Sequence, residues 1–430
     1  MVARVPELAG ELTSASARAP DAVVCTGGTR TEVLVGAGNI PLRPAIMWDD
    51  SRAVDLARSL AREHDAPGNP VTAYHPAARP AWLAEHEAEL VAGARAVLQP
   101  RTTSSRARRR YAHRRDIGPD APRRARTPSR GTGRRERLSP RPAAARGAAR
   151  DSGRRSSSGR RRAPGRGRRP RGVRVDGHRC AALALGAWRA GAAYDLSGTS
   201  EVVGVIHATR SFREGLLTVP WGRGLWHLGG PSQCGGGTVE WARTVLGLGP
   251  GELDELLAET TISAHSPLFI PYLDGERTPL WNPALTGSWQ ALRTAHGPAD
   301  LLGAVVEGIA FHARTILERA ASGATPVLPV AVGGGLARSR HWCRVRADVF
   351  GRPVARITAA EPGLTGAAML AATALGWHVD LAAAADRMAA PADVFEPDSD
   401  RAALIEARYT RFTHCVQTLQ SAPAEPTSAQ

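Results

Sequence analysis

The stretch LLGAVVEGIAFHARTILERA (residues 301–320), followed by PVLPVAVGGG (residues 326–335), decides the fold class. In the first string, apolar side chains recur at three- and four-residue steps, which predicts an amphipathic helix. The second string is a short apolar run that ends in three glycines, which predicts a buried strand and a turn. A second helix is expected immediately afterwards, and Gly351 and Pro353 would end it. Strands that alternate with helices in this way indicate an α/β fold.

The same alternation continues outward from this stretch. DAVVCTGG (residues 21–28) predicts a buried strand and a Gly turn, and YDLSGTSEVVGVI (residues 194–206) predicts a strand, a turn and a strand. ARPAWLAEHEAELVAGARAVL (residues 78–98) has apolar residues at roughly helical spacing. With 430 residues and 43% hydrophobic content, the chain is long enough for two or three domains.

The strong positive charge belongs to one segment. The net charge is +16, yet residues 101–175 hold 27 of the 56 basic residues against four acidic ones. The remainder is therefore mildly acidic, and every basic residue in the chain is Arg. The string RRSSSGRRRAPGRGRRPRG (residues 154–172) contains nine Arg and no large apolar side chain. Such a segment cannot bury enough apolar surface to offset chain entropy, so we expect it to be disordered.

Targeting and metal signals are weak in this sequence. Five cysteines lie far apart without metal-ligand spacing, so reduced thiols and no metal site are expected. No run approaches 18 uncharged apolar residues, and the N-terminus lacks a signal-peptide pattern, which favours a cytoplasmic protein without a membrane span.

Three Gly-containing turns follow expected strands, at residues 27–28, 197–200 and 333–335. Successive backbone N–H groups in such turns can cradle a phosphate, although each turn alone also fits simple chain reversal. There is no P-loop motif, no H-E-x-x-H and no G-x-S-x-G. PYLDGERTPLWNP (residues 271–283) and WDDSR (residues 48–52) bring carboxylates close to Arg. From its residues alone, an exposed turn with a local ion pair explains the first. In the second, a Trp beside two carboxylates and a guanidinium suits stacking on a sugar and bonding to its hydroxyls, and a surface helix start would look the same.

Five strings occur in an order that resembles a known family. They are PLRPAIMWDDSRA, GTSEVV, PYLDGERTPLWNP, EGIAFHAR and VGGGLARSRHWCRVRADVFGRPV. Together they are similar to the FGGY family of carbohydrate kinases, and most closely to its xylulokinase branch. The resemblance covers most of residues 21–100 and 178 to about 415.

The resemblance implies two ribonuclease-H-like domains of the actin-like ATPase kind, over residues 1–190 and 191–430, with the site between them. It implies that ATP and Mg²⁺ are the cofactors, that a sugar such as a ketopentose is the partner, and that a hydroxyl of this sugar is phosphorylated. By the family's spacing the catalytic base falls at Gly177, so the neighbouring Asp176 is the candidate. The residues expected at ATP are Gly198, Thr199, Ser200, Gly333, Gly334 and Gly335. Those expected at the sugar are Arg30, Glu32, Trp48, Asp50 and Arg52. The string at 271–283 would form the interior and cleft edge of the C-terminal domain.

Two parts of the family pattern are missing. No Asp-x-Gly-Thr-Thr/Ser turn precedes Asp21, so we expect the chain to begin inside an incomplete N-terminal domain. Residues 101–175 replace ordered elements, and shifted GC-rich codons would give their Arg, Ala, Pro, Gly and Ser. We therefore interpret the segment as an out-of-frame reading entered near Arg101 and left near His178, which predicts an impaired kinase. The underlying DNA, read in the other frames, tests this interpretation.

Two other function classes stay open. An Arg-rich arm on a kinase-like scaffold would neutralise nucleic-acid phosphates, but Tyr111 is its single aromatic residue, which disfavours nucleic acid as a partner. A non-catalytic sugar or nucleotide sensor is the other class, and calorimetry with ATP–Mg²⁺ and ketopentoses would distinguish it. The sequence does not fix the oligomeric state and leaves a homodimer open.

Overall fold

The computed structural model describes residues 21–22, 24–28, 30–64, 68–99, 173–249, 252–260, 262–323 and 327–421. The predicted disorder and frame change concern residues 101–175, of which all but the last three lie outside the described residues. The expectation about the start of the chain concerns residues that are not described either.

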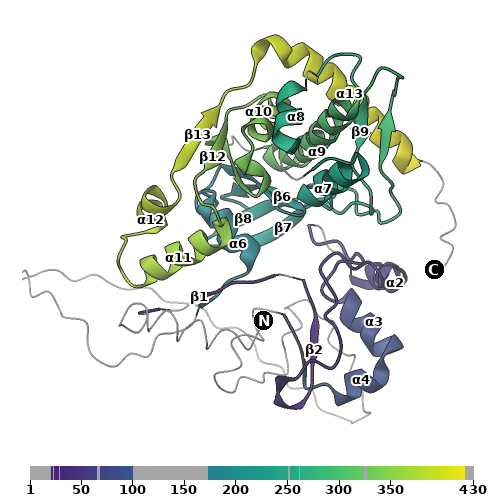
Figure 1. The fold of residues 1–430 in the computed structure, drawn as a ribbon. Coiled ribbons are helices and arrows are strands. Elements are labelled where there is room, and N and C mark those ends of the chain that lie inside the picture. The colour runs from purple at the N-terminus through teal and green to yellow at the C-terminus, as the bar shows by residue number, and fades with distance from the viewer. Residues whose placement is uncertain are drawn as a thin grey trace, which may run out of the picture.

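A seven-stranded mixed sheet forms the larger, C-terminal part, in the order β13-β12-β11-β5-β6-β8-β7 (Figure 1). Strands β5, β11 and β12 are parallel neighbours, and the other neighbouring pairs are antiparallel. The strands are β5 (Ala192–Ser197), β6 (Glu201–His207), β7 (Leu217–Gly222), β8 (Leu225–Pro231), β11 (Val327–Gly334), β12 (Val354–Ile357) and β13 (Pro391–Phe395). The antiparallel strands β8, β6 and β5 with the parallel strands β11 and β12 make the five-stranded arrangement of a ribonuclease-H-like domain, and β7 and β13 extend it at the two edges. This agrees with the predicted fold class for this part.

Helices cover both faces of this sheet (Figure 1). One face carries α7 (Gly236–Val245), α8 (Glu252–Glu259), α9 (Pro298–Ala321), α10 (Arg340–Phe350) and α13 (Ala402–Ser421). The other carries α6 (Gly177–Ala184) and α11 (Pro362–Ala374), with α12 (Leu381–Met388) beside them. A short hairpin of β9 (Leu268–Ile270) and β10 (Ser288–Gln290) lies next to α9. Successive side chains of a strand point to opposite faces of the sheet. In β11, Val330 and Val332 therefore join the core under α9, while Ala331 packs on the side of α6.

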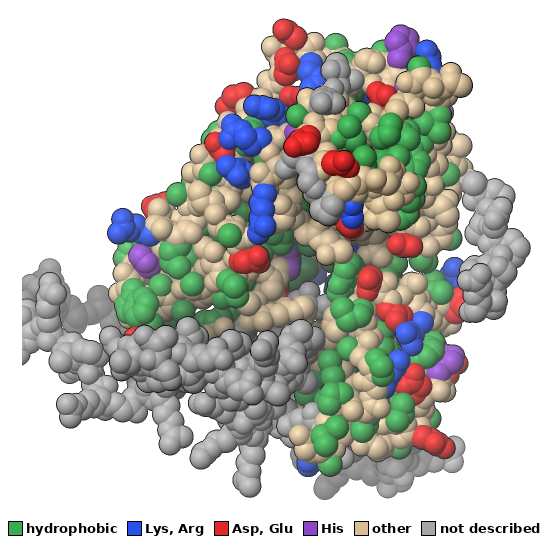
Figure 2. Space-filling view, in the orientation of Figure 1, with side chains coloured by type: hydrophobic (Ala, Val, Ile, Leu, Met, Phe, Trp, Pro, Cys, Tyr) green, Lys and Arg blue, Asp and Glu red, His purple; other side chains and the backbone are tan. Residues whose placement is uncertain are grey.

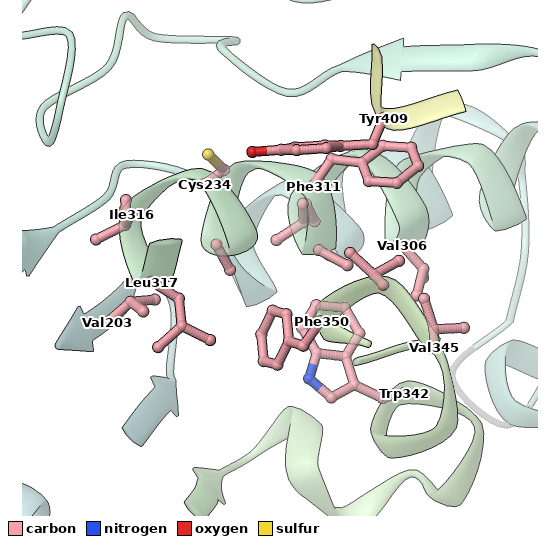
Figure 3. Close-up of a cluster of buried hydrophobic side chains, with 14 of the residues drawn as sticks. Val203, Cys234, Val306, Phe311, Ile316, Leu317, Trp342, Val345, Phe350 and Tyr409 are labelled. Atoms are coloured by element: carbon pink, nitrogen blue, oxygen red, sulfur yellow. The ribbon is translucent and has the colours of Figure 1, made fainter. Parts of the chain in front are cut away.

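The two strings that predicted the fold form the centre of the core. The predicted helix 301–320 is α9, and the predicted strand 326–335 is β11. Figure 3 shows Phe311 of α9 next to Tyr409 of α13, and Trp342 and Phe350 of α10 side by side in the same cluster. Burying a side chain such as Phe311, which has no exposed surface, contributes about 1.5–3 kcal/mol. The helix expected after residue 335 is α10, and Gly351 ends it at φ 59° as predicted.

Residues 21–99 form a smaller part beneath this unit (Figure 1). It contains β1 (Val24–Cys25), β2 (Val33–Val35), α2 (Val54–His64), α3 (Ala78–His86), α4 (Ala88–Gly93) and β3 (Ala96–Leu98). The helical pattern at 78–98 is divided: Glu87 leaves helical geometry, and residues 96–98 pair with β2 instead. Pairing with β2 satisfies the backbone N–H and C=O groups of residues 96–98, so the tertiary partner outweighs local periodicity.

Three backbone contacts join the two parts. Strand β1 pairs in parallel with β4 (Val173–Arg174), which leads directly into α6. The Gly177 N–H donates to the Gly27 carbonyl at 2.9 Å, and the Thr218 N–H donates to the Gly68 carbonyl at 2.7 Å. The turns at the N-terminal part therefore lie against α6 and β7, where a site shared by both parts can form.

Figure 2 shows basic and acidic side chains interspersed over the described surface of one face. Within the described residues, no helix combines the length and apolar character that a bilayer crossing requires.

Candidate functional site

Two of the predicted Gly turns lie side by side at the ends of β5 and β11. The register pairs Leu196 with Gly333 and Ser197 with Gly334, so residues 198–200 and 335 leave the sheet together. Gly334 has φ 102°, and a Cβ there would lie 2.2 Å from the Ser197 carbonyl oxygen. Only glycine fits this position without moving the backbone. Gly335, by contrast, has open space around its Cα.

A fourth glycine turn, which the sequence analysis missed, supports the turn at residues 198–200. Gly236 and Gly237, at the N-terminus of α7, donate their N–H groups to the carbonyls of Gly198 and Thr199, each at 2.8 Å. A Cβ on Gly236 would lie 2.7 Å from the Gly198 oxygen. The positive end of the α7 dipole is therefore held against the turn at 198–200. CGGG at residues 234–237 was the available signal, but no residue spacing links it to a turn almost 40 positions away.

A buried network of ion pairs holds the turn at residues 198–200 in place. Arg346 of α10 donates from Nε to Asp195 at 2.9 Å and from Nη2 to Glu201, while the Ser197 hydroxyl donates to Glu201 at 2.9 Å. All four side chains are buried. Burial raises the pKa of Glu201, and the Arg346 guanidinium counteracts that rise in part. These carboxylates therefore hold the turn through Arg346, while Glu201 Oε2 and Arg346 Nη1 have no hydrogen-bond partner among the described residues.

Trp48 and Arg277 meet where the two parts of the chain join. The Arg277 guanidinium lies over the Trp48 ring, 4.4 Å from its centroid, and its side chain is 4% exposed. Arg79, which is fully buried, donates to the carbonyls of Trp48 at 3.2 Å and Arg30 at 2.6 Å. Its Nε also pairs with the Glu32 carboxylate at 2.7 Å. Glu32 and Arg79 thus form a buried clamp that positions the backbone at residues 30 and 48.

Arg30 and Asp50 differ in how they are engaged. Burial, together with the charge of Arg79, lowers the pKa of Arg30 to about 10, and its Nη1 donates to the Tyr74 carbonyl at 3.3 Å. Asp50 accepts from Arg52 Nε at 2.8 and 2.9 Å, and Arg52 lies over the Trp82 ring. Burial alone would raise the pKa of Asp50, but its bonds to Arg52 lower it overall. Asp50 and Arg52 therefore bind each other, while the adjacent Asp49 is exposed.

The string PYLDGERTP is buried apart from Asp274 and the half-buried Leu273, so the alternative of an exposed turn with a local ion pair is wrong. Glu276 has no exposed surface and accepts from Ser232, Cys234 and two backbone N–H groups. His312 of α9 lies 3.5 Å away and also bonds the Thr278 carbonyl. Cys234, Glu276 and His312 offer ligand atoms within 4.8 Å of one another. Cys234 donates to Glu276 at 2.8 Å, and His312 bonds the Tyr272 hydroxyl and the Thr278 carbonyl. Interior packing of this kind is what fixes Arg277 at the edge.

Asp176 is the N-cap of α6. Its carboxylate accepts the Arg179 N–H at 2.7 Å and lies 3.3 Å from the Arg179 guanidinium. Gly177, the position that the family spacing favours, contacts the turn at 26–28, and a Cβ there would lie 3.0 Å from the Gly27 oxygen. The beginning of α6 thus lies at the junction, close to the N-terminal part.

Comparison with known proteins gives a family match over the sheet-forming region. Residues 193–375 match the C-terminal domain of the FGGY family of carbohydrate kinases. A xylulose kinase from Staphylococcus epidermidis is 34% identical over 164 residues, which are 37% of this chain and 32% of that protein. A gluconokinase from Bacillus subtilis is 32% identical over 166 residues, covering 35% of this chain and 32% of the relative. In these alignments the chain spans about a third of the length of the curated relatives.

A solved structure agrees in fold over a longer range. The crystal structure of a xyloylose kinase from Brucella ovis superposes with a TM-score of 0.70 at 21% identity, covering 96% of this chain and 88% of that one. The likeness concerns the fold alone. It confirms the predicted α/β sugar-kinase fold with two domains.

Proposed function

We propose that this chain transfers a phosphoryl group from ATP to a hydroxyl of a small sugar, because residues 193–375 match the C-terminal domain of the FGGY family of carbohydrate kinases. The observation that carries the proposal is the register that brings the turns at 198–200 and 333–335 together. Ser232 links them to the contact of Trp48 with Arg277, since its N–H donates to the Glu201 carbonyl and its own carbonyl accepts from Arg277. Residues 1–190 and 191–430 would supply the two lobes, and a cytoplasmic location is part of the same proposal.

The nucleotide would bind at the glycine turns. The backbone around Gly198, Thr199 and Ser200 would hold phosphates, with the α7 N-terminus behind it, and Gly333, Gly334 and Gly335 would lie along the adenosine. Close backbone packing at Gly334 and open space at Gly335 suit a flat ligand surface. Mg²⁺–ATP supplies the phosphoryl group, with the metal neutralising charge between the phosphates. Asp195 and Glu201 are bound to Arg346, so phosphate oxygens and water would hold most of the Mg²⁺ shell.

The sugar would bind at the junction, against Trp48 and between Arg30 and Arg277. Glu32, Asp50 and Arg52 would act by positioning, since each is already paired with another side chain. Asp176 is the proposed base: it would take the proton of the attacking hydroxyl while the new O–P bond forms and the bond to ADP breaks. To do so, its carboxylate must exchange its bond with Arg179 for one with the substrate.

A coupled ADP-release assay over a sugar panel tests the proposal. The panel should contain ketopentoses such as xylulose, which the resemblance favours, together with sugar acids and polyols. We expect sugar-dependent ADP release that is lost in Asp176→Asn and retained in the surface variant Arg58→Met, whose side chain is 71% exposed. Absence of release with every sugar, despite Mg²⁺–ATP binding by calorimetry, would reject the kinase activity in favour of a sensor. Light scattering on the same preparation would report whether the chain is a homodimer.

A further inference from the structure

Ser232, which directly follows β8, is bonded to both halves of the proposed site. Its N–H donates at 2.9 Å to the carbonyl of Glu201, the residue after the turn at residues 198–200. Its own carbonyl accepts from Arg277 Nη2, and the Arg277 guanidinium lies over the Trp48 ring. Ser232 is 1% exposed, and a displacement in such a closely packed interior is passed on to the neighbouring groups. A shift of either contact of Ser232 therefore acts on the other.

The Glu276 carboxylate holds Ser232 in this position. Glu276 has no exposed surface, and its Oε2 accepts from the Ser232 hydroxyl at 3.0 Å and from the Cys234 thiol at 2.8 Å. Its Oε1 accepts the Gln233 N–H at 2.8 Å and the Arg277 N–H at 2.7 Å. An ionised carboxylate has no hydrogen to donate and offers about four acceptor positions, which matches these four donors. One oxygen atom thus joins the backbone after β8 to the backbone of Arg277.

The surrounding backbone makes this connection stiff. Residues 236–237, at the start of α7, donate both of their N–H groups to the turn at residues 198–200. On the other side, the Thr278 N–H donates to the Pro231 carbonyl at 3.0 Å. A Cβ on Gly230 would lie 2.2 Å from the Thr278 hydroxyl oxygen. The end of β8 and the buried string that holds Glu276 therefore have little room to move independently.

We propose that Glu276 is a positioning residue that couples the two binding sites, so that a nucleotide at the turn at residues 198–200 changes the contact of Arg277 with Trp48. This inference rests on the proposed function and states how its nucleotide and sugar sites communicate. Either ligand fixes Ser232, so the second ligand meets contacts that are already in place. By linkage each ligand raises the affinity for the other by the same factor, and such factors are typically about 5 to 150.

The fluorescence of Trp48 tests this inference without a sugar and without catalysis. The chain contains ten Trp, so the Trp48 contribution is the difference between each protein and the same protein carrying Trp48→Phe. We expect saturating Mg²⁺–ATP to change this contribution in the wild-type full chain, because the guanidinium over the ring moves. Glu276→Gln should lose most of the change, because an amide cannot accept all four bonds. Arg58→Met, whose side chain is 71% exposed, should keep it.

A second variant covers the case in which Glu276→Gln does not fold. Arg277→Met keeps the backbone N–H that Glu276 accepts, and it removes the guanidinium that joins the Ser232 carbonyl to the Trp48 ring. Calorimetry should show that this variant still binds Mg²⁺–ATP, while its Trp48 emission should no longer respond.

Each outcome bears on the inference in a different way. Mg²⁺–ATP binding that leaves Trp48 emission unchanged in the wild type would overturn the inference and keep the proposed function. A full response in Glu276→Gln or in Arg277→Met would overturn it as well. Absence of Mg²⁺–ATP binding would reject both. A Trp48 response that is lost in the variants, combined with no ADP release for any sugar, would keep the coupling and reject the kinase activity.

Discussion

Replacing Arg346 by Leu should strongly destabilise the C-terminal part. Arg346 is fully buried and pairs with Asp195 at 2.9 Å and with Glu201, which are also buried. Its removal leaves two carboxylates without a counter-charge. Breaking a buried pair by removing one partner costs about 3–5 kcal/mol, which corresponds to a fall in Tm of roughly 6–20 °C for a unit of about this size.

The loss of stability in Arg346→Leu should be larger at high pH than at low pH. Burial already raises the pKa of Glu201 to about 8 from an ordinary value of 4.5. A folded-state pKa above the unfolded one contributes stability below pH 4.5 that is lost as the pH rises toward 8. Without Arg346 the carboxylates are harder still to ionise, so the variant should lose more stability relative to wild type at pH 8 than at pH 5.5.

Urea unfolding and thermal melts of the full chain at both pH values would measure this. The matched control is Arg338→Leu, because Arg338 is 69% exposed and lies 3.9 Å from Glu361; such surface pairs contribute about 0–1 kcal/mol. The reasoning fails if Arg346→Leu unfolds at the same urea midpoint as Arg338→Leu at pH 8, or if its deficit is larger at pH 5.5.

Three further changes test other parts of the structure. Gly334→Ala places a Cβ 2.2 Å from the Ser197 oxygen, so ATP affinity measured by calorimetry should fall about tenfold or more. The control Gly297→Ala adds a Cβ in open space and should keep the affinity. An unchanged affinity in Gly334→Ala would contradict a nucleotide role for this turn. Arg408→Met removes a buried ion pair with Glu307 and hydrogen bonds to three carbonyls. We expect the free energy of unfolding to fall by about 3–5 kcal/mol and α13 to be cleaved faster by protease. A protease pattern like that of the wild type would show that Arg408 does not hold α13 in place. Burial lowers the pKa of His178 from 6.5 to about 4, so its neutral form contributes stability above pH 6.5 that is lost as the pH falls toward 4. His178→Gln should therefore flatten the fall in Tm across that window, and an unchanged slope would show that other groups cause it.

The patterns that the sequence predicted correctly were local. Helix α9 and strand β11 follow from apolar spacing and a Gly turn, and Gly351 ends α10 as expected. The division of residues 78–98 could not be predicted, because β3 exists through its pairing with β2 more than 60 positions away. The buried state of PYLDGERTP was equally hidden, because charged residues between prolines have the composition of a surface turn.

The candidate site shows the same limit. Its glycine turns were visible as strings, and the register of β5 with β11 brings two of them together. The support from Gly236 and the contact of Arg277 with Trp48 had no signal in the spacing. The role of Asp176 stays a prediction, and so do the roles of the other site residues.

The sequence by itself determined the alternation of helices and strands and the positions where only glycine allows the chain to turn, because those properties depend on neighbours a few residues apart. The tertiary structure decided which charges meet. Arg346 reaches Asp195 across 151 positions, whereas Arg277 lies over the Trp48 ring and donates to the Ser232 carbonyl. Charge pairing acts through space and changes with burial, so it is set by the topology of the sheet and not by distance along the chain.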